Sequence, residues 1–163
     1  MKIHGLIHTF PKHIKMFIAA FVIVLSIGYI TGLMFVNETD ATHPNGIEEN
    51  YLGNENDEEA EVMKFQKSDR EMLTTLHSHI LSMSFIFFFL GSLVAITSLP
   101  RKIKSFLMIE PFFSIILTFG GIYLLWQGVL WMKYVVMLSG ILMTIVFLVA
   151  SFSVLFQLLK KEK

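Results

Sequence analysis

The sequence has no cysteine among its 163 residues. A disulfide framework, a thiolate metal site and a cysteine nucleophile are therefore excluded. Charged residues are also scarce, at 16% of the chain, whereas a soluble domain carries about 25%. The formal net charge is +0, which gives no electrostatic footprint for nucleic acid. The phosphate-binding-loop, zinc-protease and serine-hydrolase motifs are missing as well, so the sequence does not support these enzyme classes.

What the chain has instead is long apolar runs. Hydrophobic residues make up 54% of it, and sixteen residues are phenylalanine. A bilayer core about 30 Å thick is crossed by about 20 apolar helical residues. Because that core holds no water, backbone groups must pair within their own segment, which favours helices. We therefore predict an all-α fold, a four-span antiparallel transmembrane helix bundle. Its predicted spans are residues 14–36, 80–99, 106–126 and 134–159.

The basic residues are distributed unevenly between the two sides that four spans define. Nine lie on the side of the two termini and the turn at 100–105, and four lie on the side of the loop at 37–79 and the turn at 127–133. Basic residues accumulate on the cytoplasmic side of membranes. We therefore predict a protein of the cell inner membrane with its segments 1–13 and 160–163 in the cytoplasm. The nine basic residues are Lys2, Lys12, Lys15, Arg101, Lys102, Lys104, Lys160, Lys161 and Lys163.

The first span begins like a signal peptide, with Lys12 and Lys15, but its apolar part is longer than the usual 7–15 residues. No small-residue cleavage signal precedes Asn37, so we predict an anchor that is not cleaved. Three histidines precede the span among these lysines. They predict an interfacial segment that lies on anionic lipid: His4, His8 and His13.

The loop at 37–79 is the main hydrophilic region and carries eleven of the thirteen acidic residues. Its first part, residues 37–46, is rich in turn formers, which predicts irregular structure. Residues 56–67 place acids before lysines, an order that complements a helix dipole. We therefore predict a short helix in this second part.

The start of the second long helix is marked by a local motif. Ser68 and Glu71 have the spacing of a capping box, with Ser68 as the N-cap residue. The helix is therefore predicted to run without a break from about Asp69 to Leu99.

Two histidines, His77 and His79, lie where the second apolar run begins. Polar side chains at that depth are costly unless they have a partner. Residues two apart on a helix point about 200° apart, so the two histidines cannot hold one metal together. His79 shares a helix face with Met83, and imidazole with thioether suits Cu(I), while a single histidine suits haem iron. The candidate metal ligands are therefore His77, His79 and Met83. As alternatives, His77 and His79 form hydrogen bonds to neighbouring groups, or they relay protons. Candidate partners of an inward-facing His79 are Asn37, Glu38, Gln127, Lys133 and Tyr134.

Glu110 is the acidic residue inside a predicted span. It follows the basic residues Arg101, Lys102 and Lys104 and precedes Pro111. An acid suits the positive end of a helix and proline suits its first turn, so both residues predict a helix start here. The sharper hypothesis is that Glu110 binds a proton or a cation.

Small residues allow close helix packing, and the chain offers Gly28-x-x-x-Gly32 and Gly91-x-x-x-Ala95. These patterns predict packing within the bundle or, as the alternative, a homodimer face. The predicted partners are the lipid bilayer and either a second copy of the chain or another membrane protein, with no nucleic acid.

The run from Leu76 to Gly91 has an H-x-H at the mouth of a helix, then an aromatic-rich span and a glycine. In this pattern the chain resembles a family of uncharacterised small bacterial four-helix integral membrane proteins, over residues 53–159. More loosely, it is similar to helices of haem- or copper-linked membrane proteins, which carry further histidines in other spans. The resemblance implies a small inner-membrane protein, a non-enzymatic accessory or assembly factor. The alternative is a haem- or copper-binding redox or transport component that uses His77 and His79.

Overall fold

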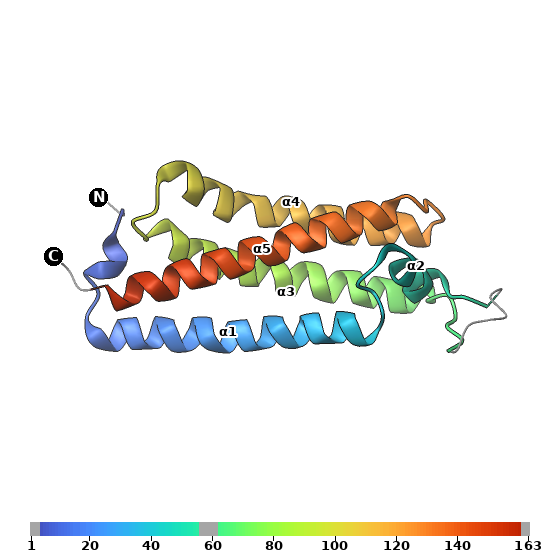
Figure 1. Ribbon diagram of the computed structural model, residues 1–163, viewed down its shortest axis with the longest axis horizontal. Helices are drawn as coiled ribbons and strands as arrows, with labels where there is room; N and C mark the ends of the chain where they lie inside the picture. The colour runs from blue at the N-terminus through green and yellow to red at the C-terminus, as the bar shows by residue number, and fades with distance from the viewer. Residues whose placement is uncertain (1–3, 56–61, 161–163) are drawn as a thin grey trace.

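Helices make up most of the computed structural model, which describes residues 4–55 and 62–160 (Figure 1). The long helices are α1 (Lys12–Glu38), α3 (Asp69–Ala95), α4 (Arg101–Trp126) and α5 (Met132–Leu159). The short helices are η1 (Leu6–His8), a 3-10 helix before α1, and α2 (Pro44–Leu52) after it. Each of the four long helices is long and apolar enough to cross a membrane. The described residues form no strand, so the predicted all-α bundle with four candidate spans is confirmed.

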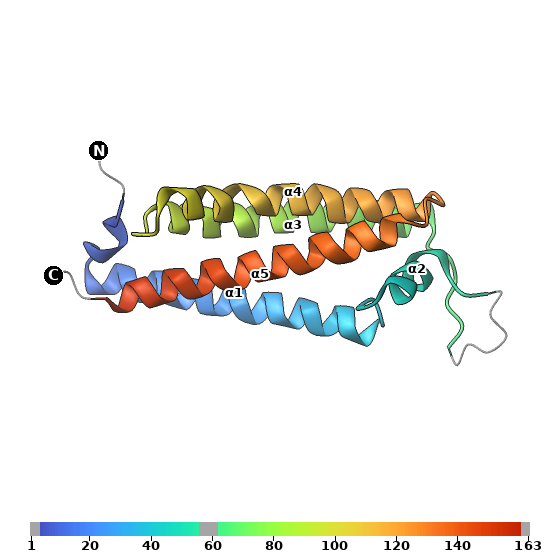
Figure 2. The same ribbon diagram turned by 45° about the horizontal axis from the view of Figure 1, so that its top comes forward.

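The four long helices lie side by side, and consecutive ones run in opposite directions (Figure 1). We call the end that holds η1 and the last turn of α5 the terminal end. The opposite end, which holds α2, is the loop end (Figure 2). The most extensive helix packing is between α4 and α5, and α3 packs mainly on α4. Gly91 takes part in this packing as predicted, because a Cβ there would lie 3.7 Å from the backbone of Met108.

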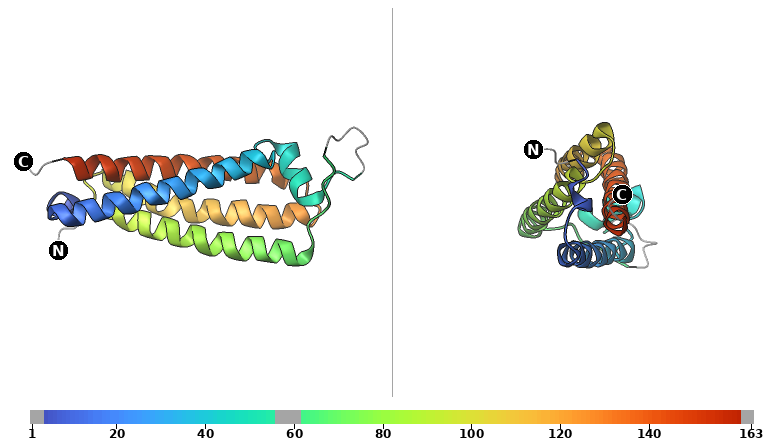
Figure 3. Two further views of the ribbon diagram at one scale, coloured as in Figure 1. Left: turned by 90° about the horizontal axis from the view of Figure 1, so that it is seen from below. Right: turned by 90° about the vertical axis from the view of Figure 1, so that its left-hand side faces the viewer.

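Helix α1 lies on the side of this group and packs chiefly on α5 (Figure 3). Its buried residues are Ile18, Val22 and Tyr29. The Tyr29 ring stacks on Phe147 of α5, with ring centres 3.8 Å apart. Towards the loop end α1 loses its neighbours, and all residues from Ile30 to Glu38 are exposed.

The predicted start of α3 is confirmed at Asp69, and the capping box is present. The Ser68 hydroxyl accepts a hydrogen bond from the Glu71 amide, and the Glu71 carboxylate accepts one from the Ser68 amide. The helix ends at Ala95, however, and not at Leu99. Pro100 disfavours helical geometry at Leu99, so the helix could not continue to that residue.

The expectation that Pro111 lies in the first turn of its helix is wrong. Helix α4 begins at Arg101, directly after Pro100, and Pro111 lies inside it. Pro100 supplies the extended conformation of an N-cap residue, with φ −55° and ψ 143°. Glu110 therefore lies well inside α4 and not at a helix start.

The predictions for the loop were also wrong in part. Helix α2 starts within the segment that we predicted to be irregular, because Pro44 sits at its first turn and His43 caps it by accepting from the Gly46 amide. A Cβ at Gly46 would lie 1.8 Å from the carbonyl oxygen of Asp40, so this close approach requires glycine. The short helix predicted over 56–67 is not found at residues 62–67, and residues 56–61 lie outside the described residues.

Candidate functional site

Small polar residues are buried in both α4 and α5. Ser114 and Thr118 come from α4, Ser139 and Ser151 come from α5, and each is at most 7% exposed. The hydroxyls of Thr118 and Ser139 lie 2.7 Å apart. The Ser139 hydroxyl donates to the carbonyl of Val135, so its oxygen accepts from Thr118. This hydrogen bond joins α4 to α5 at these two residues.

Glu110 lies one turn from Ser114, toward the terminal end. Its Oε1 accepts a hydrogen bond from the Ser114 hydroxyl. Its Oε2 is buried and has no hydrogen-bond partner in the described part of the chain. Glu110 follows Arg101 by nine residues, about 14 Å along the axis, which is beyond the reach of the helix-end dipole. An ionised carboxylate in this position would have an oxygen without compensation.

Pro111 changes the backbone beside Glu110. It is buried inside α4 and has no amide hydrogen, so the carbonyl of Leu107, four residues earlier, lacks its helical donor. Pro111 therefore removes one backbone hydrogen bond from the part of α4 that carries Glu110.

Tyr29 brings α1 to the same level of the bundle. Its hydroxyl lies 3.3 Å from the hydroxyl of Thr144 on α5. This part of the bundle thus contains the Glu110 carboxyl group and hydroxyls from α1, α4 and α5.

The terminal end is closed by the N-terminal segment. The amide of Ile7 donates to the carbonyl of Ile96 at 3.2 Å. The Ser98 amide and hydroxyl both donate to Oε1 of Gln157, at 2.6 and 2.9 Å. His8 contacts the same hydroxyl, with Nε2 3.3 Å from Ser98 Oγ, while its Nδ1 is buried with no hydrogen-bond partner among the described residues.

Lys104 completes this end of the bundle and is only 9% exposed. Its ammonium group donates to the carbonyl of Ala95 at 2.9 Å, which caps the C-terminal end of α3. The same group lies 3.4 Å from Nδ1 of His4. His4 and His8 therefore both reach the turn between α3 and α4 from the N-terminal segment.

The structure places the predicted metal ligands on an exposed part of α3. His77 and His79 are exposed and Met83 is half-buried. Nδ1 of His79 lies 2.9 Å from the carbonyl of Thr75 on its own helix, and the ring lies 5.5 Å from that of Phe119. No group of three or more His, Asp or Glu side chains suited to a metal occurs in residues 4–55 and 62–160. The described contacts also join His79 to none of its candidate partners from other helices.

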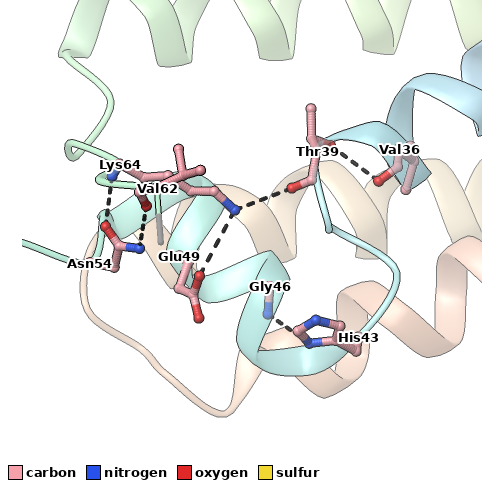
Figure 4. Close-up of polar contacts among 8 residues, drawn as sticks. All are labelled: Val36, Thr39, His43, Gly46, Glu49, Asn54, Val62 and Lys64. Carbon is pink, nitrogen blue, oxygen red and sulfur yellow. Dashed lines mark hydrogen bonds and ion pairs between the residues drawn. The ribbon is translucent and has the colours of Figure 1, made fainter. Parts of the chain in front are cut away.

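The loop end carries a second set of polar contacts, shown in Figure 4. Lys64 lies 3.8 Å from the Glu49 carboxylate and 3.5 Å from the carbonyl of Thr39. Asn54 accepts from the Lys64 amide at 2.6 Å and donates to the carbonyl of Val62 at 3.0 Å. These bonds hold α2 and residues 62–67 together as a cap on the loop end.

Further contacts fasten this cap to the long helices. Lys133 of α5 forms an ion pair with Glu48 at 2.6 Å. The indole of Trp126 donates to the carbonyl of Lys67 at 2.8 Å. Burial raises the pKa of Tyr51 to about 12, with a smaller opposing effect from its hydrogen bond to Asn50. The ion pair and the indole hydrogen bond therefore hold the loop segment against α4 and α5.

The sequence analysis singled out Glu110 but missed the residues around it. Ser114 and Thr118 follow Glu110 at intervals of four, so their common face was readable from helical periodicity. The contact of Tyr29 with Thr144 was not readable, because it depends on packing between helices far apart in the sequence.

The comparisons with known proteins agree with this architecture. Residues 41–163 match the family model Aq_1264_TM, which describes a transmembrane helical domain. The searches of curated proteins and of solved structures found no match to this chain.

Proposed function

Because the chain belongs to this family of transmembrane helical domains, we propose that it is a non-enzymatic accessory protein of the inner membrane. In this proposal it associates with another membrane protein through α1. The family match begins at Ala41, after the end of α1, and so includes α2 to α5. Helix α1 is an additional helix beside the matched domain (Figure 3).

The observation that carries the proposal is the uncovered surface of α1. A Cβ at Gly28 or Gly32 would meet nothing within 4 Å, so these glycines do not pack within the bundle, and that prediction was wrong. Small residues allow the backbone of a second helix to approach closely. An additional membrane helix can therefore dock on this part of α1 without a change in the bundle.

The proposed orientation places the terminal end in the cytoplasm. This end carries basic side chains from α1 and α4, and its described residues form no ion pair there. Such a distribution is typical of the cytoplasmic side of a membrane protein. The basic residues concerned are Lys12, Lys15, Arg101, Lys102 and Lys104.

The test compares complexes extracted from native membranes in mild detergent, by native mass spectrometry of the tagged protein. We expect the 18.7-kDa chain to carry a second, different polypeptide, which is lost when Gly28→Leu and Gly32→Leu are combined. The control is Ile23→Leu on another exposed side of α1, which should keep the partner. A wild-type chain that is found alone, or bound to a second copy of itself, contradicts the proposal.

The alternative function, haem or copper binding at His77, His79 and Met83, has weaker support. His79 already uses Nδ1 in a contact with its own helix, and His77 points to a different side of α3. Metal analysis and a visible spectrum of the purified protein distinguish the two functions. Bound haem or copper that disappears in His79→Ala would favour the alternative.

A further inference from the structure

We propose that residues 62–67, which we call the apolar segment, lie in the lipid headgroup region and anchor the loop to the membrane surface. The side chains that enter the lipid are those of Val62, Met63 and Phe65. The partner is the phospholipid bilayer around this transmembrane domain. The inference is independent of the proposed association through α1, because it concerns a different part of the chain.

The first argument is that the protein leaves these three side chains uncovered. Val62, Met63 and Phe65 are 67%, 58% and 68% exposed. Apart from Leu130 and Trp131 in the turn between α4 and α5, the other exposed large apolar side chains lie within the four long helices. Lipid covers such side chains on a membrane helix. In water, a cluster of them outside the helices would be unfavourable.

The apolar segment is fixed to α2 and the residues that follow it. The Asn54 amide donates to the carbonyl of Lys64 at 2.9 Å, and the Lys67 amide donates to the carbonyl of Tyr51 at 3.2 Å. The ammonium group of Lys64 turns towards Glu49 and Thr39 (Figure 4). Its neighbours Met63 and Phe65 remain exposed. The exposure therefore belongs to a segment that is held in place.

The second argument is the level of the segment relative to the membrane. The carbonyl of Lys67 accepts a hydrogen bond from the indole of Trp126, the last residue of α4. The 26 residues of α4 span about 39 Å, more than the hydrocarbon core of about 30 Å, so the ends of α4 reach the headgroup regions. Phe65 is two residues from Lys67, at most about 7 Å of chain, and each headgroup region is about 5–7 Å thick. Phe65 is therefore within reach of the headgroups.

Other aromatic residues mark the same interface. Trp131 and Tyr134 are exposed where the chain passes from α4 to α5. Tryptophan and tyrosine side chains gather at the level of the headgroups in membrane proteins. Figure 2 shows this turn and α2 at the same end of the bundle. An apolar segment bonded to α2 and to Trp126 thus lies at the end of the bundle where the aromatic side chains indicate the membrane surface.

The third argument is the charge beside the apolar side chains. Residues 62–68 include two lysines and no acidic residue, although the rest of the loop is rich in acids. Lys67 forms no ion pair within residues 4–55 and 62–160, and the exposed Arg70 follows in the first turn of α3. Basic side chains next to a membrane are attracted to the phosphates of anionic lipids. The combination of apolar and basic groups suits a phospholipid surface.

The experiment uses the full-length chain in vesicles of phosphatidylcholine and phosphatidylglycerol, with one nitroxide label on a single introduced cysteine. A label at Phe65→Cys should collide more often with oxygen, which partitions into lipid, than with a water-soluble nickel chelate. The lipid reference is Phe88→Cys on an exposed side of α3, and the water reference is Asn45→Cys on α2. We expect the ratio of the two collision rates at position 65 to be higher than at position 45.

A ratio at position 65 equal to that of the water reference overturns the proposal. The proposal also fails if the label is shielded only in native membranes and not in these vesicles, because a protein would then cover the segment.

A second measurement retains the native side chains. A photoactivatable phospholipid with its reactive group near the glycerol should form adducts on residues 62–67 of the wild-type protein, located by peptide mass spectrometry. Combining Met63→Ser with Phe65→Ser should reduce these adducts and leave those on the exposed apolar residues of α3, which report that the bundle is intact. Wild-type protein with adducts on its long helices and none on residues 62–67 overturns the proposal.

Discussion

Gly121 of α4 faces Val136 of α5 so closely that a Cβ at position 121 would lie 2.9 Å from Cγ2 of Val136. Real Cβ atoms essentially never come so near, and the β-branched valine has little freedom to move. The neighbouring Gly120 has nothing within 4 Å of a Cβ. Two adjacent glycines thus have opposite surroundings, one in the closest helix interface and one on the outer surface.

The first prediction uses this pair. Gly121→Ala should lower the free energy of unfolding by about 1–3 kcal/mol, as overpacking does. Gly120→Ala should leave the free energy of unfolding unchanged or raise it slightly, because alanine favours helices. Reversible unfolding in mixed micelles measures both variants. Equal stability of the two variants would show that α4 and α5 do not pack as described.

The second prediction concerns the hydroxyl pair one turn away. Thr118→Val and Ser139→Ala should be coupled by about 0.6 kcal/mol, the average for hydrogen bonds between membrane helices. A double-mutant cycle of unfolding free energies measures this coupling. Additive effects of the two substitutions would mean that the hydroxyls do not bond to each other.

Much of the fold could be predicted from the sequence because its signals are local. The apolar runs and the Ser68–Glu71 motif each specify a helix from neighbouring residues alone. The face shared by Glu110 and Ser114 follows from helical periodicity. The stacking of Tyr29 on Phe147 does not, because it depends on the way in which α1 packs on α5.

The errors have equally physical reasons. Residues 37–46 and 100–105 were predicted to be irregular or a turn, yet Pro44 and Pro100 each stand at the start of a helix. Pro111 was predicted at a helix start because proline is common there. It lies inside α4 instead, because a helix packed against its neighbours tolerates the loss of the backbone hydrogen bond that proline cannot make. The role of Gly28 and Gly32 could not be predicted from the sequence, because a pattern of small residues does not specify which helix packs against it.

The third prediction tests the capping box. Ser68→Ala removes the acceptor of the Glu71 amide and should cost about 1 kcal/mol of stability. The control is Ser92→Ala, since the Ser92 hydroxyl bonds only to its own helix at the carbonyl of Phe88. Thermal unfolding in detergent compares the two variants, and a cost at Ser92 equal to that at Ser68 would speak against the cap.

The fourth prediction follows from Tyr51. Its pKa is raised from 10.0 to about 12, so between these values the folded protein keeps the phenol proton while the unfolded chain loses it. The stabilising contribution is complete below pH 10 and is lost as the pH rises through about 12. The tyrosinate absorbance of wild-type protein minus that of Tyr51→Phe should therefore rise near pH 12. A midpoint at pH 10 would mean that α2 does not bury this side chain.

We propose that the chain crosses the membrane as four helices, with its loop end outside and its terminal end in the cytoplasm. Because the chain has no cysteine, single cysteines at Asn45 and Ser105 can be labelled without a background signal. A membrane-impermeant maleimide should label Asn45→Cys in intact cells and should label Ser105→Cys only after permeabilisation. Equal labelling of both positions in intact cells, or the reverse order, would contradict the account.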